Sequence, residues 1–131
     1  MKYLLDVNTL VALGHTLHAH HAQAGHWLKS VTPTAAAIGT CAITELGFVR
    51  VSVQAGLQPD VGTALQALAK LKASSPVKVE FWPDGLGVDR LPKYVKKPAD
   101  LTDGHLLELA LEHNAQLVTL DGKIPGALLV S

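Results

Sequence analysis

The chain has one cysteine, no net charge and few charged side chains, and each shortage excludes something. Cys41 has no second cysteine to pair with, so an internal disulfide is impossible and an oxidising compartment is not indicated. Eleven basic residues balance eleven acidic ones, so no overall charge attracts the chain to nucleic acid or to an anionic membrane. Any such partner must be bound by a local patch of charge.

The longest stretch without Asp, Glu, Lys or Arg, residues 7–28, is not expected to span a membrane. It carries five histidines, which are too polar for the hydrocarbon core of a bilayer. Lys2 is followed by Asp6 before the apolar region of a signal peptide can develop, so we expect a cytoplasmic protein. A length of 131 residues with 48% hydrophobic residues predicts one domain, residues 1–131, with a substantial core.

Short apolar segments alternate with helical patterns along the chain. The expected strands cover residues 3–5, 38–43, 77–82, 116–120 and 127–130. The expected helices cover residues 9–13 and 18–29, a segment from Glu45, a segment from about residue 60 to residue 74, and residues 102–114. Strands that alternate with helices favour an α/β fold with a mostly parallel sheet and helices on both of its faces.

Local signals sharpen three parts of this pattern. Thr44 follows an apolar run and is placed to cap a helix that begins at Glu45. The strand at 77–82 alternates apolar and polar residues, which is typical of a strand near the edge of a sheet. Residues 83–100 are rich in proline, glycine, lysine and aspartate and predict a loop with one helical turn at 91–95.

Four acidic residues occupy positions where ligands collect in such a fold. Asp6, Glu45 and Asp121 each follow an apolar run, and the carboxyl ends of parallel strands meet at one edge of a sheet. The helix at 102–114 has Asp103 in its first turn, on a face that it shares with Leu107, Ala110 and Leu111 and that we expect to point inward. Carboxylates brought together repel one another, and Mg²⁺ or Mn²⁺ removes that conflict. Such a site suits phosphodiester hydrolysis.

Each acid also has a simpler interpretation. A single aspartate at a strand end usually caps backbone amides, and Asp103 can complement the dipole of its own helix. Four acids at equivalent positions would require four separate coincidences. The alternative to a nuclease is a domain of the same fold that binds a partner or a structural metal through these acids and cleaves nothing.

Four segments then connect the sequence to a known family: LLDVNTLVAL at 4–13, HAHHAQAGHWL at 18–28, ITELGFVRV at 43–51 and LTDGHLLELALEHNAQLVTLD at 101–121. In this order they resemble the PIN-domain family, and more closely the VapC-type toxins of bacterial toxin–antitoxin pairs. The resemblance implies a PIN-like three-layer α/β/α sandwich with a central, mostly parallel sheet. It also implies a Mg²⁺- or Mn²⁺-dependent endoribonuclease that hydrolyses RNA with a metal-activated water.

The resemblance implies roles for single residues as well. Asp6, Glu45 and Asp103 would hold the metal directly or through water, and Asp121 would complete the negative pocket. The positions that support the carboxylates in related proteins correspond here to Asn8, Thr44 and Thr119. The family further implies a homodimer and a cognate antitoxin, through which alone the toxin reaches DNA. The turn after Asp121, GKIPG, departs from the basic and aromatic stretch of many relatives, so we expect no RNA contacts from it.

Two other features suggest different chemistry. The segment DVNT at 6–9 is close to the DxDxT motif of haloacid-dehalogenase-type phosphatases, in which Asp6 would be the nucleophile, but Asn8 cannot act as the required general acid. The histidines between residues 15 and 26 lack the i, i+4 spacing of HExxH metal sites, so we interpret them as partly solvated side chains.

Basic residues near the expected site are few. The run of Lys93, Lys96 and Lys97 is most simply a solvated loop. Arg50 lies five residues after Glu45 and is a candidate contact for an RNA phosphate or for an acidic partner. A pocket that is acidic at its centre needs such peripheral cations to admit RNA.

Overall fold

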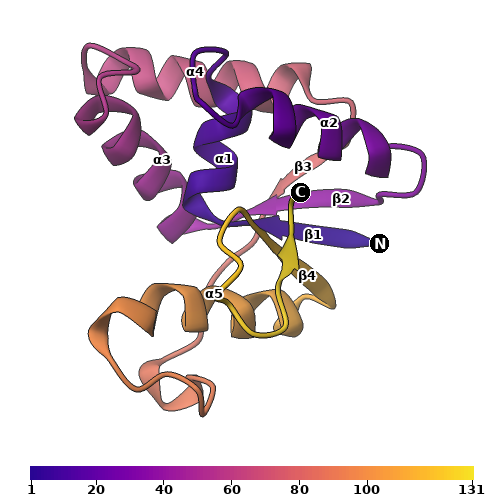
Figure 1. Cartoon of the computed structure of the whole chain (residues 1–131), viewed down its shortest axis with the longest axis vertical. Helices are drawn as coiled ribbons and strands as arrows, with labels where there is room; N and C mark the ends of the chain where they lie inside the picture. Colours follow the sequence, from indigo (N-terminus) through magenta and orange to yellow (C-terminus); the bar gives the residue numbers. More distant parts are fainter.

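The computed structural model describes residues 1–131 and contains a five-stranded sheet between two helical layers (Figure 1). The strands are β1 (Lys2–Leu5), β2 (Ala37–Thr40), β3 (Val79–Phe81), β4 (Ala115–Thr119) and β5 (Leu128–Leu129). The α-helices are α1 (Val7–Gly14), α2 (His21–Val31), α3 (Ala42–Gln54), α4 (Val61–Ser74) and α5 (Leu101–Glu112). Every pair of neighbouring strands is parallel, so the predicted α/β/α sandwich with a mostly parallel sheet is confirmed.

The strand order is β3-β2-β1-β4-β5, so the chain reverses its direction of travel across the sheet once. The connections from β1 to β2 and from β2 to β3 run through α1 to α4, which Figure 1 shows on one side of the sheet. The chain then returns to the other side of β1 through α5, which covers the opposite face. The carboxyl ends of β1 and β4 therefore flank the point at which ligands bind in open α/β sheets.

Two hydrophobic clusters fill the space on the two faces of the sheet. Successive side chains of a strand point to opposite faces, so Tyr3 and Leu5 join the larger cluster with α1 and α2, while Leu4 joins the smaller one with α5. In β4, Val118 and Leu117 divide in the same way. Both central strands are therefore buried on two sides, which is why their sequences are continuous apolar runs.

Strand β3 lies at one edge of the sheet, as its alternating sequence predicts. It leads into Trp82, whose indole is 5% exposed and lies over Gly39 of β2. A side chain at Gly39 would overlap the indole ring, so only glycine allows this close approach. None of the helices combines the length and the apolar character that crossing a membrane would require.

Four local predictions differ from the structure. Helix α3 begins at Ala42 with Cys41 as its N-cap, and Thr44 lies inside the first turn, where its Oγ1 accepts a hydrogen bond from the Cys41 amide at 2.9 Å. Thr44 thus closes the helix start from its third position instead of preceding it, because the strand stops at Thr40 and leaves room for an earlier start. Strand β2 is accordingly shorter than the predicted 38–43.

The other two differences concern residues 83–112. The predicted helical turn at 91–95 is reduced to one hydrogen bond, from the Val95 amide to the Pro92 carbonyl at 3.1 Å, and the 3₁₀ helices are at Val88–Arg90 and Pro98–Asp100. Helix α5 buries Leu106, Leu109 and Ala110, whereas Leu111 of the predicted inward face is 61% exposed. The helix is rich in leucine all round, so two stripes satisfy the helical spacing and the sequence does not choose between them.

Candidate functional site

Asp6 stands directly after β1 and is held by two donors. Its Oδ1 accepts the backbone amide of Thr9 at 2.9 Å, which makes it the N-cap of α1. Its Oδ2 accepts the hydroxyl of Thr119 at 2.6 Å, across the junction between β1 and β4. The side chain is fixed in this geometry because the residue is only 6% exposed.

Thr119 connects Asp6 to Asp121. The same Thr119 hydroxyl that donates to Asp6 accepts the backbone amide of Asp121 at 2.9 Å. Asp121 is exposed, and its Oδ1 accepts the amide of Lys123 at 2.9 Å, so the carboxylate also closes the turn that follows β4. One hydroxyl thereby links the carboxylate of Asp6 to the backbone of Asp121 at the ends of adjacent strands.

Asp103 completes this group from the opposite layer. It lies in the first turn of α5, which packs against β1 and β4. Burial raises the pKa of the Asp103 carboxyl, and the negative charges of Asp6, Asp121 and Asp100 raise it further. The charges of Asp6 and Asp121 both act on Asp103, and we call these three residues the acidic site.

Glu45 does not join the acidic site in this structure. Its Oε2 accepts the Thr40 hydroxyl at 2.6 Å and forms an ion pair with Lys72 Nζ at 2.6 Å. No three side chains of the types that ligate metals are grouped as a preformed metal site. Of the four acids that the sequence places at one edge, Asp6 and Asp121 therefore act on Asp103, whereas Glu45 is paired with Lys72 of α4.

The other predicted residues lie in varied surroundings. Thr119 contacts the carboxylate of Asp6 and the backbone amide of Asp121, as described, whereas Asn8 is exposed and its side chain makes no hydrogen bond. Thr44 is buried and caps its own helix, and the hydroxyl that reaches Glu45 is that of Thr40. Arg50 is exposed on α3 and forms no ion pair.

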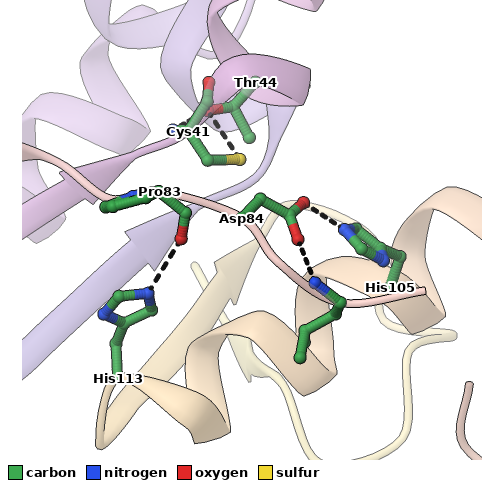
Figure 2. Close-up of polar contacts among 7 residues, drawn as sticks. Cys41, Thr44, Pro83, Asp84, His105 and His113 are labelled. Atoms are coloured by element: carbon green, nitrogen blue, oxygen red, sulfur yellow. Dashed lines mark hydrogen bonds and ion pairs between the residues drawn. The ribbon is translucent and has the colours of Figure 1, made fainter. Parts of the chain in front are cut away.

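The helix that carries Asp103 is clamped to the segment after β3 (Figure 2). Asp84 accepts hydrogen bonds from the His105 imidazole and from the backbone amide of Leu86, and the Pro83 carbonyl accepts one from His113 at the other end of α5. Burial opposes ionisation of Asp84, but the bond from His105 and the amide of Leu86 outweigh it and lower its pKa. His105 thus has a partner of its own outside the acidic site.

A second contact holds the loop before α5 beside Asp103. A side chain at Gly104 would overlap Val95 and touch Pro92, so this glycine lets the loop lie flat on the helix. Tyr94 in that loop has a buried hydroxyl without a hydrogen-bond partner. Burial raises the pKa of Tyr94, and Asp103 and Asp100 raise it further. The exposed residues Lys93, Lys96 and Lys97 belong to this loop, which contacts α5 at Gly104, the neighbour of Asp103.

Sequence reasoning missed several of these contacts. Thr40 could be found from its place as the last residue of a strand, which is the position that Thr119 occupies on β4. Nothing in the sequence links Lys72 to Glu45 or Asp84 to His105, because these partners are brought together by the packing of separate elements.

The acidic site offers the oxygen ligands that a hard divalent cation prefers. Its donors are carboxylate oxygens only. Burial first and the charges of Asp6, Asp121 and Asp100 second raise the pKa of Asp103, and a bound cation would offset the part that comes from these charges. Mg²⁺ keeps several of its waters and is commonly bound by one or two carboxylates, so a closed cage of protein ligands is not required. The residues present therefore fit Mg²⁺ or Mn²⁺.

A parallel sheet with helices on both faces and aspartates at the ends of β1 and β4 defines a PIN-like α/β domain. Solved structures of similar fold include VapBC2 of Rickettsia felis bound to a DNA fragment from its promoter, with a TM-score of 0.66, 17% identity and coverage of 98% of this chain and 97% of that one. VapC20 of Mycobacterium tuberculosis, a toxin that cleaves the sarcin-ricin loop, gives a TM-score of 0.60 at 15% identity and covers 93% and 92%. No protein-family profile matches the chain.

Sequence similarity identifies the family. Ribonuclease VapC39 of Mycobacterium tuberculosis is 37% identical over 131 residues, which cover 95% of this chain and 91% of that protein. The chain belongs to the VapC family of PIN-domain proteins.

Proposed function

We propose that the chain is a Mg²⁺- or Mn²⁺-dependent endoribonuclease that acts as the toxin of a type II toxin–antitoxin pair. The observation that carries this proposal is the acidic site, in which the charges of Asp6 and Asp121 act on a partly buried Asp103 at the switch point of the sheet. Relatives at 37% identity that are named ribonucleases support the choice of RNA as substrate.

In this proposal the aspartates bind the cation, and neighbouring groups of the chain position the aspartates. Mg²⁺ or Mn²⁺ would supply a Lewis acid that polarises the scissile phosphate and makes water a better nucleophile. Thr119 keeps Asp6 and Asp121 in register, and the amide of Thr9 fixes the second oxygen of Asp6. The clamp between Asp84 and His105 sets the position of α5 and hence of Asp103.

The lysines beside the acidic site would bind the RNA backbone. Lys93, Lys96 and Lys97 are exposed and unpaired, and Val95 between them packs against Gly104, the neighbour of Asp103. Phosphates that would be repelled by the aspartates gain a cationic path along this loop. Arg50 on α3 is a further candidate on the side of Glu45.

An RNA cleavage assay tests the catalytic part of the proposal. We expect the purified chain to cut RNA with Mg²⁺ or Mn²⁺ and to lose activity with EDTA. The Asp103→Asn variant should lose at least about 100-fold in rate. Even changes of residues that only support the metal ligands cost about 10- to 100-fold in activity or metal affinity, and Asp103 is a proposed ligand. Asp89→Asn is the matched control, since Asp89 is exposed and takes part in none of the hydrogen bonds or ion pairs of the site.

The outcomes separate the competing functions. Cleavage that persists in EDTA or in Asp103→Asn would exclude this metal-dependent mechanism. Metal binding without cleavage of any RNA would favour the non-catalytic binding domain. A covalent phosphate trapped on Asp6 would favour the phosphatase instead, although both oxygens of Asp6 already accept hydrogen bonds.

The proposed partner is an antitoxin that brings a cationic side chain to the acidic site. The VapBC2 complex bound to promoter DNA is the precedent among proteins of this fold, and it favours DNA contact through the complex. We also propose a homodimer. Co-expression with the small reading frame next to the gene should give a stable complex in size-exclusion chromatography, and the complex should show no RNA cleavage. A chain that stays free and active in that mixture would exclude this partner.

A further inference from the structure

Glu45 is held by two donors that converge on one of its oxygens. Thr40, which is fully buried at the end of β2, donates its hydroxyl to Oε2 at 2.6 Å. Lys72, in the last turn of α4, places Nζ 2.6 Å from the same oxygen. The second oxygen, Oε1, takes part in none of the hydrogen bonds within the chain.

The position of Glu45 separates it from the three aspartates. The charges that raise the pKa of Asp103 come from Asp6, Asp121 and Asp100, and Glu45 is not among them. Glu45 is nevertheless in the first turn of α3, which starts at the end of β2, and β2 is the neighbour of β1. The residue lies at the correct edge of the sheet with its carboxylate directed to α4.

We propose that Lys72 is an internal competitor of the metal: it pairs with Glu45 in the metal-free protein, and a divalent cation gains Glu45 as a ligand only by displacing it. The ammonium group of Lys72 neutralises the Glu45 carboxylate, which would otherwise attract the divalent cation. This inference rests on the metal-dependent function proposed above and adds a residue that sets how much metal the protein needs. Lys72 is a positioning residue, since it acts through Glu45.

The pair is partly shielded from solvent, with side-chain exposures of 36% for Lys72 and 22% for Glu45. The free energy of such an ion pair is small, so Lys72 weakens metal binding without preventing it. Removing the ammonium group should tighten metal binding about fivefold, the factor that an ion pair at the upper end of the surface range accounts for.

A titration of the free protein with Mn²⁺, in the absence of RNA, measures this effect. Lys72→Met keeps the aliphatic stem and removes the charge. Lys70→Met is the matched control, because Lys70 lies two residues earlier on α4, is exposed and forms no ion pair. We expect about fivefold tighter binding for Lys72→Met than for Lys70→Met. Equal or weaker binding for Lys72→Met overturns the proposal, as does an absence of Mn²⁺ binding in all three proteins.

A second pair of variants excludes a general effect of charge. In a Glu45→Gln background the competitor has nothing to compete for, so adding Lys72→Met should leave Mn²⁺ affinity within about twofold. A gain that persists in this background means that Lys72 acts by long-range repulsion, which refutes the proposed pairing.

RNA cleavage is scored separately from metal binding, so the two proposals fail in different ways. If the wild-type chain cuts RNA but Lys72→Met binds Mn²⁺ no more tightly, the competitor is refuted and the nuclease stands. If Lys72→Met binds Mn²⁺ more tightly but no variant cuts RNA, the competitor is supported and the nuclease is refuted.

Discussion

Replacing Asp103 by asparagine should stabilise the metal-free protein at neutral pH. The ionised carboxylate is partly buried and is opposed by the charges of Asp6, Asp121 and Asp100, and asparagine keeps its shape without its charge. Like-charge interactions at partly solvated positions cost a few tenths of a kcal/mol each, so three of them amount to about 1 kcal/mol. For a chain of this size, that corresponds to a rise of about 4 °C in Tm.

The pH dependence follows from the direction of the pKa shift. The folded-state pKa of Asp103 lies above its ordinary value of 3.8, so between these two values the native state binds the proton more readily than the unfolded state does. The cost of ionising Asp103 is fully present at neutral pH and disappears as the pH falls through this window. The advantage of Asp103→Asn should therefore be largest near neutral pH and absent below the ordinary value.

Thermal unfolding monitored by circular dichroism between neutral and acidic pH provides the test. Asp89→Asn is the control and should not change Tm, since Asp89 is exposed. Saturating Mg²⁺ should raise Tm of the wild type but not of Asp103→Asn, because a ligand stabilises the state that binds it. A lower Tm for Asp103→Asn at neutral pH would show that the carboxylate is stabilised where it lies, which refutes the proposed repulsion within the acidic site.

Three further predictions concern residues around the site. Thr119→Val removes the donor to Asp6 and should lower the free energy of unfolding by about 1–3 kcal/mol in denaturant titrations, whereas Thr119→Ser should restore most of it. Asp84→Asn weakens the clamp on α5 and should cost about 1–2 kcal/mol at neutral pH. Because the pKa of Asp84 is lowered from 3.8, its contribution is present above that value and lost as the pH falls below it, so the two proteins should converge in acid; a gap that stays constant with pH contradicts the clamp. Gly39→Ala should cost about 1–3 kcal/mol through overlap with Trp82, and an unchanged midpoint would mean that the indole moves freely.

The acidic site shows how much of a functional site the sequence pattern predicts. Asp6 and Asp121 follow buried strands, and in a parallel sheet the ends of such strands meet at one edge. The structure has both residues beyond the ends of β1 and β4, and their charges act on Asp103 of α5. The local chemistry of Thr44 was misjudged because the start of a helix depends on where the preceding strand stops.

The direction of the Glu45 side chain could not be predicted at all. Glu45 and Lys72 are on different helices, and their contact depends on how α3 and α4 pack together. The clamp between Asp84 and His105 likewise joins a loop to a helix that follows much later in the chain. Periodicity reports which face of an element is apolar, but it carries no information on which surfaces of separate elements meet.

The sequence by itself determined the α/β class, the parallel sheet and the edge at which the acids lie, because apolar runs and helical periods are local properties of the chain. Tertiary structure alone decided which charges face each other. It placed Asp103 where the charges of Asp6 and Asp121 act on it, and it paired Glu45 with Lys72 instead of with the other acids. Side-chain direction depends on the packing of helices that are distant in sequence, and electrostatic energy depends on distances of a few ångströms that only this packing sets.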